Sequence, residues 1–297
     1  MVEKNVSICQ NLCMFSDTHF HFKSMCDNGI DGTEVLSAMA LRDCFFGLDI
    51  GTRAGDLQNR RQVVENCIDG ISDSTLAQKS RDFIHFTAGI WPDVDSIKDR
   101  ENQIKLLRES ITPGSIIAVG ECGLDHHWNP SGVDGRSEND FDEQIYRGER
   151  ELFEAQLLLA KELSLPVIVH SRDAFEDSFD CIKNIGYDNG IIHCYSYGLE
   201  EARAFLDRGW YIALGGGITY TKKSKLEEMK ELIKFIPSDR LLTETDAPYL
   251  APVPFRGQTN TPVLVEHIFT YIAQVREISV DTLNALVDEN IKKLFFM

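Results

Sequence analysis

The sequence lacks the features that mark membrane-bound, secreted and disulfide-stabilised proteins. No stretch approaches the roughly 18 consecutive apolar residues that a membrane-spanning helix needs, and the N-terminal residues carry an early acid and no apolar core with a small-residue cleavage site. The eight cysteines are spread over 297 residues without a CxxC pair, which is not the density of a disulfide scaffold. These absences predict a soluble cytoplasmic protein, or alternatively a nuclear one, whose thiols are reduced and structural.

Positive charge is also scarce. The chain has 30 Lys and Arg against 47 Asp and Glu, a formal net charge of −17 at pH 7. This balance argues against a protein that binds nucleic acid through a broad basic surface, because such a surface attracts phosphates by its summed positive charge. A polyanionic substrate would have to be held locally, by bound divalent cations and a few well-placed arginines.

Glycine-rich phosphate loops of the GxGxxG and Walker types are absent too, which disfavours a doubly wound open sheet, the second candidate fold. Eight short apolar runs are present instead, near 12–17, 44–50, 83–90, 116–121, 167–170, 190–193, 210–214 and 241–246. Helix-length segments separate them, at 35–42, 58–69, 99–110, 149–163, 174–184, 200–207 and 225–235. Eight strand and helix alternations predict a (β/α)8 TIM barrel, with residues 1–297 forming a single domain.

Four histidines and two acidic residues stand at or near the predicted strand ends. They are His19, His21, Glu121, His170, His193 and Asp246. His19 and His21 are two residues apart, so both imidazoles point to the same side of an extended chain. The carboxyl ends of barrel strands meet at one mouth, and these groups would be costly to bury without partners. We therefore expect a metal site at the mouth. Imidazoles and carboxylates together suit Zn²⁺, Mn²⁺ or Fe²⁺, whereas Mg²⁺ prefers mostly oxygen ligands, so the ligand set alone does not choose the metal.

Motifs along most of the chain resemble those of the TatD-related metal-dependent deoxyribonucleases, a branch of the amidohydrolase-like barrel superfamily. These motifs are DTHFH (17–21), VGECGLD (119–125), LPVIVHSRDA (165–174), IIHCYSYG (191–198), LLTETDAPYLAP (241–252) and RGQTNTP (256–262). The resemblance implies a centre of two divalent metal ions, Mg, Mn or Zn. It also implies the ligands: one ion is held by His19, His21 and Asp246, the other by His170 and His193, and Glu121 bridges the two.

The same resemblance places Arg172 and Arg256 near the site, where a planar guanidinium suits a phosphate. The chain departs from the family pattern at two positions. Trp91 stands where many relatives have the histidine of a G-x-H-P segment, and Thr261 stands where the glutamate of an N-E-P segment is usual. Trp91 either packs in the interior or stacks on an unpaired base. The acidic loop 129–142 follows a strand and is expected to cover part of the mouth.

The expected activity is exonuclease-like hydrolysis of DNA phosphodiesters by a metal-activated water, on single-stranded or fragmented ends, without a membrane or an obligate protein partner. Asp246 would orient the water and accept its proton. Glu121 would bridge the two ions, and Glu244 would support the ligands. Two alternatives stay open. One is an amidohydrolase-like enzyme acting on a small amide, lactone or phosphoester, since fold does not dictate substrate. The other is a non-catalytic binding module, although structural metal sites are usually closed by four protein ligands.

Overall fold

Eight parallel strands form one sheet in the computed structural model, which describes residues 15–127 and 137–296. The strands follow one another around the sheet in chain order: β1 (Asp17–Phe20), β2 (Gly47–Asp49), β3 (Ile84–Ala88), β4 (Ala118–Asp125), β5 (Val167–Arg172), β6 (Gly190–Ile192), β7 (Tyr211–Leu214) and β8 (Leu241–Thr243). Nearly every strand residue is buried, because helices cover the outside and side chains fill the inside. The predicted (β/α)8 barrel is confirmed.

The sheet closes between its first and last strands. Phe20 pairs in parallel with Ala247, and the Thr18 hydroxyl donates to the Thr243 carbonyl over 3.0 Å. This closure makes the eight strand ends share one mouth. Across the described residues, none of the helices has the length and apolar character to cross a membrane.

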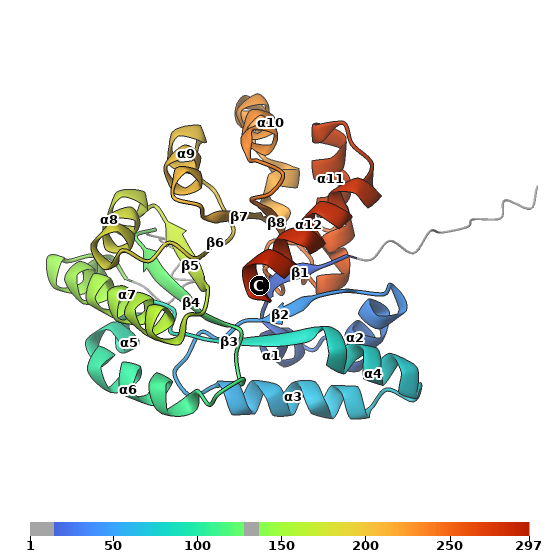
Figure 1. Ribbon diagram of the computed structural model, residues 1–297, viewed down its shortest axis with the longest axis horizontal. Helices are drawn as coiled ribbons and strands as arrows, with labels where there is room; N and C mark the ends of the chain where they lie inside the picture. Colours follow the sequence, from blue (N-terminus) through green and yellow to red (C-terminus); the bar gives the residue numbers. More distant parts are fainter. Residues whose placement is uncertain (1–14, 128–136, 297) are drawn as a thin grey trace, which may run out of the picture.

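Twelve α-helices and four short 3₁₀ segments surround the strands within the described residues (Figure 1). The α-helices are α1 (Phe22–Asp27), α2 (Gly32–Leu41), α3 (Leu57–Asp69), α4 (Ser74–Phe83), α5 (Val94–Lys98), α6 (Arg100–Ser110), α7 (Glu143–Leu163), α8 (Phe175–Ile185), α9 (Leu199–Asp207), α10 (Leu226–Phe235), α11 (Val265–Arg276) and α12 (Val280–Phe295). The 3₁₀ segments are η1 (Glu138–Asp140), η2 (Gly216–Tyr220), η3 (Lys223–Lys225) and η4 (Pro262–Leu264). Asp31 and Asp73 cap α2 and α4 by accepting hydrogen bonds from the first free amides.

Several strands are bounded differently from the prediction, and the first and fourth differ most. The first strand begins at Asp17 rather than at residue 12, and residues 12–14 lie outside the described part. Phe15 precedes the strand, and its ring packs on that of Phe269 with the centroids 5.1 Å apart. The fourth strand continues past Glu121 to Asp125, so Glu121 lies inside the strand rather than at its end. A Cβ at Gly123 would lie 1.8 Å from the His170 carbonyl. Glycine therefore lets β4 run on closely beside β5.

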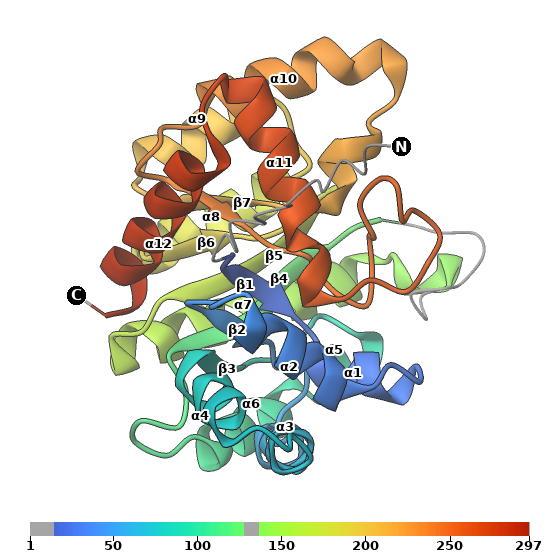
Figure 2. The same ribbon diagram turned by 90° about the vertical axis from the view of Figure 1, so that its right-hand side faces the viewer.

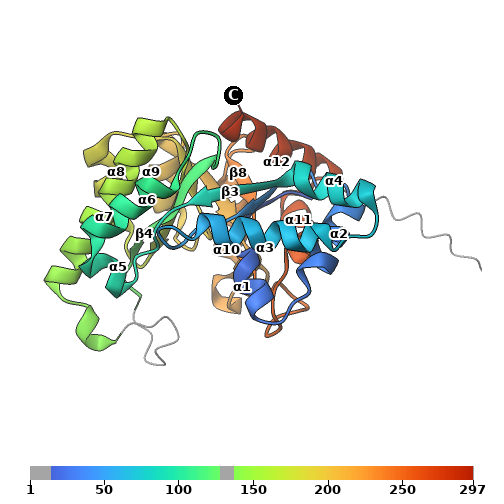
Figure 3. The ribbon, with the colours of Figure 1, turned by 90° about the horizontal axis from the view of Figure 1, so that it is seen from below.

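The segments that follow the strands lie on one side of the barrel. In Figure 2 the loop between β8 and α11 and the C-terminal end of α12 are on opposite sides of the sheet. Figure 3 shows α1 and the loop after β8 together along the lower edge. Residues 129–136 of the predicted mouth loop lie outside the described part, and the chain resumes with η1 before α7.

Candidate metal centre

Six side chains converge at the mouth, and they are the six predicted from sequence: His19, His21, Glu121, His170, His193 and Asp246. The Nε2 atoms of His19 and His21 are 3.3 Å apart. Asp246, which follows β8, places Oδ1 3.6 Å from His19 Nε2 and 3.5 Å from His21 Nε2. Strands far apart in sequence thus bring their polar ends into one cluster.

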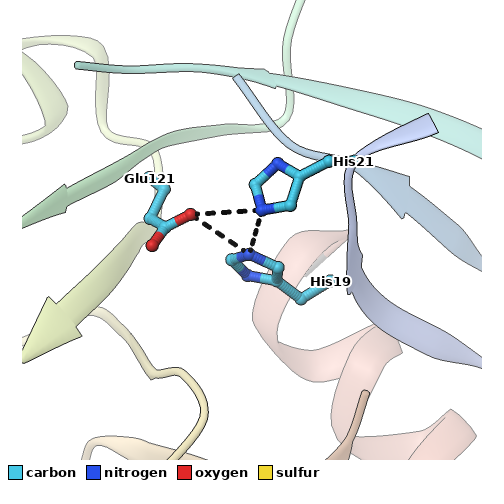
Figure 4. Close-up of side chains that lie close together, drawn as sticks. All are labelled: His19, His21 and Glu121. Carbon is cyan, nitrogen blue, oxygen red and sulfur yellow. Dashed lines mark hydrogen bonds and ion pairs between the residues drawn. The ribbon is translucent and has the colours of Figure 1, made fainter. Parts of the chain in front are cut away.

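Glu121 stands between two pairs of histidines and presents one oxygen to each. Its Oε2 atom lies 3.3 Å from His19 Nε2 and 3.5 Å from His21 Nε2, as Figure 4 shows. Its Oε1 atom lies 2.9 Å from His170 Nδ1 and 3.0 Å from His193 Nε2. The latter two nitrogens are 3.3 Å from each other. The carboxylate can therefore serve two neighbouring centres at once.

The spacing of these atoms fits divalent cations. Ligand atoms bound about 2.0–2.2 Å from one tetrahedral ion lie about 3.4 Å from one another. The distances that join the Nε2 atoms of His19 and His21 to Glu121 Oε2 and Asp246 Oδ1 run from 3.3 to 3.6 Å. His19 and Glu121 are buried, whereas the side chains of Asp246 and His170 are 13% and 15% exposed. The cluster is thus anchored in the barrel and open to solvent on one side, so a water or a substrate atom can reach it.

The electrostatics keep the acidic members ionised. Burial by itself would raise the pKa of Glu121, but the charge of His193 and hydrogen bonds from His170 and His19 outweigh it and hold that pKa well below its usual range. Burial likewise opposes ionisation of Asp246, but the hydrogen bond with His21 and the charges of the nearby imidazoles lower its pKa. Both carboxylates are therefore available as ligands or proton acceptors.

Buried carboxylates outside the cluster orient two of its imidazoles. Asp125 Oδ2 lies 3.0 Å from His170 Nε2, on the ring edge opposite Glu121. Glu244 Oε1 lies 3.4 Å from His193 Nδ1 and accepts the Cys194 amide over 2.5 Å. The hydrogen bond with Asp125 fixes the His170 ring and its tautomer, whereas His193 Nδ1 lies within ion-pair distance of Glu244 without forming a hydrogen bond. Glu244 was predicted to support the ligands; Asp125 was missed, although it lies in the VGECGLD motif and ends β4.

Asp17 is a second acidic residue that the sequence reasoning missed. Its carboxylate accepts hydrogen bonds from the Thr245 hydroxyl at 2.6 Å, the Thr245 amide at 3.0 Å and the His19 amide at 3.1 Å. Burial raises its pKa to about 8, against the lowering effect of these hydrogen bonds. Asp17 thus ties the start of β1 to the segment that carries Asp246. Its place at the head of DTHFH was the available signal.

The two predicted arginines lie at different depths. Arg172, at the end of β5, is half-buried, and its charge acts on Asp125 and on the Cys194 thiol. Arg256 is exposed on the loop after β8, with its guanidinium 4.5 Å from the centroid of the Tyr220 ring. Arg172 therefore belongs to the surroundings of the centre, and Arg256 to the rim of the mouth.

Two aromatic rings flank the cluster. The partly buried Trp91 ring meets the His170 ring edge to face, with centroids 5.7 Å apart. Tyr249 is 54% exposed, and its ring lies 6.0 Å from that of His21. Trp91 therefore stands beside the centre, where the usual histidine was missing from the sequence pattern.

Known proteins are similar to this chain in sequence. A family model described as TatD related DNase matches residues 16–296. The chain is 37% identical over 216 residues to YabD, an uncharacterized metal-dependent hydrolase of Bacillus subtilis, with 72% of this chain and 78% of that protein covered. It is 33% identical to the 3'-5' ssDNA/RNA exonuclease TatD of Erwinia amylovora, with 77% and 85% covered.

A solved structure extends the likeness to the whole fold. The crystal structure of YJJV, a TatD homologue from Escherichia coli, superposes with a TM-score of 0.76 at 26% identity, covering 96% of this chain and 99% of that one. The fold, the convergent histidines and carboxylates, and a family match along nearly the whole chain lead to one conclusion. The chain belongs to the TatD related DNase family of metal-dependent hydrolases.

Proposed function

We propose that this protein is a divalent-metal-dependent deoxyribonuclease that removes nucleotides from the ends of DNA by hydrolysing phosphodiester bonds. The observation that carries the proposal is the position of Glu121, whose two carboxylate oxygens face two separate histidine pairs. One carboxylate shared by two ligand sets is the arrangement expected for two metal ions acting on one phosphate. The exonuclease named among the relatives supports nucleic acid as the substrate class.

In this proposal the ligands divide into two sets around Glu121. His19, His21 and Asp246 would hold one Mg²⁺, Mn²⁺ or Zn²⁺ ion, and His170 and His193 would hold the other. When bound, the ions supply Lewis acidity, which lowers the pKa of an attacking water and offsets the charge that develops on the phosphate.

Asp246 is proposed as the residue that handles the proton. Its carboxylate is ionised because the hydrogen bond with His21 and the neighbouring imidazoles lower its pKa despite burial. It therefore orients the attacking water and accepts the proton at a carboxylate oxygen. Glu244 positions the His193 ring through its Nδ1 atom, on the ring edge that does not face Glu121. Arg172 neutralises part of the phosphate charge from the end of β5.

The second candidate is a hydrolase of small amides, lactones or phosphoesters. Barrels with similar ligands carry out such reactions, but small-molecule sites are concave and mostly apolar. The surroundings of this centre are instead partly exposed aromatic and cationic side chains: Trp91, Tyr249, Arg172 and Arg256. That combination suits a nucleobase beside a phosphate, so we favour the nuclease.

The test uses metal-depleted protein reloaded with Mg²⁺, Mn²⁺ or Zn²⁺, with metal content measured directly. Single- and double-stranded DNA labelled at the 5' or the 3' end then distinguishes attack from an end from internal cleavage. We expect metal-dependent release of nucleotides from an end, blocked by a chelator. The variants E121Q and D246N should lose turnover while keeping the wild-type circular dichroism spectrum.

Three results would contradict the proposal. If fully metal-loaded protein leaves every DNA intact but hydrolyses a lactone, amide or small phosphoester, the small-molecule hydrolase is correct. If it binds DNA without turnover and a chelator does not change the binding, the metal has a structural role. Unchanged turnover in E121Q would refute the shared-carboxylate arrangement itself.

A further inference from the structure

Four exposed cations gather on neighbouring segments beside the mouth. Lys222, Lys223 and Lys225 follow one another around η3, and Arg256 lies on the loop after β8. We call these four residues the basic ridge. Among the ion pairs formed by the described residues, none involves a member of the ridge, although the chain has a net charge of −17. Positive charge left uncompensated in so acidic a protein points to an anionic partner.

Among the described residues, the two acidic residues that follow the lysines in sequence form no ion pair with the ridge. Glu227 and Glu228 stand in the first turn of α10, directly after the lysines. Glu227 pairs with Lys230 at 2.8 Å, on the same helix. The lysine side chains thus remain available to a ligand that approaches the mouth from solvent.

The ridge is physically continuous with the metal centre. The Val253 amide donates to the Thr219 hydroxyl over 2.9 Å, which joins the loop after β8 to η2. Arg256 lies over the Tyr220 ring at 4.5 Å, and Tyr220 ends η2 immediately before the lysines. The same loop carries Tyr249, whose amide donates to the Asp246 carbonyl over 2.8 Å. A chain of packed residues therefore leads from Asp246 to the lysines.

Tyr249, on the same loop as Arg256, presents an exposed ring beside the centre. Its ring is more than half exposed and stands edge-on to His21. A base stacks on such a ring only when it is not enclosed in a duplex, and each stacked base contributes roughly 1–3 kcal/mol to binding. An aromatic ring followed by a row of cations is the arrangement used to hold single strands.

We propose that the basic ridge binds the phosphates of the part of a single-stranded DNA that remains beyond the nucleotide being removed, with Tyr249 stacking on the base next to the cleaved bond. The inference rests on the proposed nuclease function and adds to it a second contact region outside the metal centre. A dinucleotide is too short to use the ridge, whereas a long strand engages it. The ridge therefore sets affinity for long strands and leaves the chemistry unchanged.

The experiment compares the wild type with the triple variant K222A/K223A/K225A, both loaded with Mn²⁺. Turnover of a single-stranded 20-mer and of a dinucleotide is measured across a range of KCl concentrations. For the 20-mer we expect KM to rise by about tenfold or more with kcat nearly unchanged. Each lost phosphate contact on a single strand lowers the salt dependence of binding by about 0.7 in log–log slope, so three contacts lower it by about 2. The dinucleotide should show no change.

A control variant removes the same charge elsewhere. K105A/K292A/K293A alters lysines on α6 and α12, outside the segments that form the ridge, and should leave both substrates unaffected. Equal loss in the two triple variants would mean that only net charge matters. A wild-type enzyme whose KM is the same for the 20-mer and the dinucleotide would also overturn the inference.

A binding measurement separates this inference from the proposed function. The anisotropy of a fluorescent single-stranded 20-mer, titrated with metal-free protein, reports on the ridge without turnover. Weaker binding by K222A/K223A/K225A but not by the control supports the ridge even if the enzyme proves not to cleave DNA. Equal binding by the wild type and K222A/K223A/K225A, together with normal DNA cleavage, refutes the ridge and leaves the nuclease assignment intact.

Discussion

Replacing Asp125 with asparagine tests whether the centre depends on carboxylates that are not themselves ligands. Asp125 Oδ2 faces His170 Nε2 at 3.0 Å, while Oδ1 accepts the His127 amide at 2.9 Å. Asparagine keeps the shape and the second of these hydrogen bonds. It places an NH₂ group against His170 Nε2, which then has to give up its proton. The proton moves to Nδ1, the nitrogen that faces Glu121 and His193, and Nδ1 is no longer free to bind metal.

The magnitude follows from the usual effect of removing a partner of a metal-binding histidine, about 10–100-fold in metal affinity or activity. That corresponds to about 1.4–2.8 kcal/mol of binding free energy. We expect calorimetric titration of metal-free D125N with Mn²⁺ to show one ion weakened by this factor and the other nearly unchanged, because His19 and His21 do not contact Asp125. Turnover at limiting Mn²⁺ should fall in parallel and recover as Mn²⁺ is raised.

A matched control lies close by. Asp173 pairs with His127 at 2.7 Å on the exposed side of the mouth, and its φ of 53° is a conformation that asparagine tolerates. D173N should bind Mn²⁺ as the wild type does. If D125N also keeps both ions at wild-type affinity and full turnover at limiting metal, the reasoning about His170 is wrong.

Three further predictions concern stability. Burial raises the pKa of Asp288 from 3.8 to about 6, so the contribution of Asp288 to wild-type stability falls as the pH rises from about 4 to 6 and stays lower above it, by roughly 3 kcal/mol at most. In D288N this contribution should be absent, so the change in the free energy of urea unfolding between pH 4 and pH 7 should differ between the two proteins, and equal changes would contradict the prediction. R60M removes the partner of the buried Asp49 carboxylate and should lower the free energy of unfolding by about 3–5 kcal/mol. The double variant R60M/D49N should recover part of this loss. An unchanged denaturation midpoint in R60M would refute the pairing. Mn²⁺ at about 100 times its dissociation constant should raise the free energy of unfolding by about 2.7 kcal/mol per site. The melting temperature should therefore increase in the wild type and increase less in E121Q. Equal increases in the two proteins would show that the ion binds elsewhere.

The sequence by itself determined which residues could form a metal centre and on what kind of scaffold. Short apolar runs alternating with helical segments gave the barrel, because burial on both faces of a parallel strand requires continuous apolar residues. The polar groups at the ends of those runs, such as His170 and His193, had to meet, because a barrel collects its strand ends at one mouth. These are local patterns, and a local pattern is readable along the chain.

Only the tertiary structure decided which groups touch. Asp125 and His170 are 45 residues apart, and Asp17 and Thr245 are 228 apart. Their contacts depend on strand register and on the closure of β8 onto β1. In the closed barrel, each oxygen of the Glu121 carboxylate faces a different pair of histidines. Periodicity along the chain indicates which face of a strand a residue occupies. The distance between side chains on different strands depends on how all eight strands pack, so it is defined only in the folded barrel.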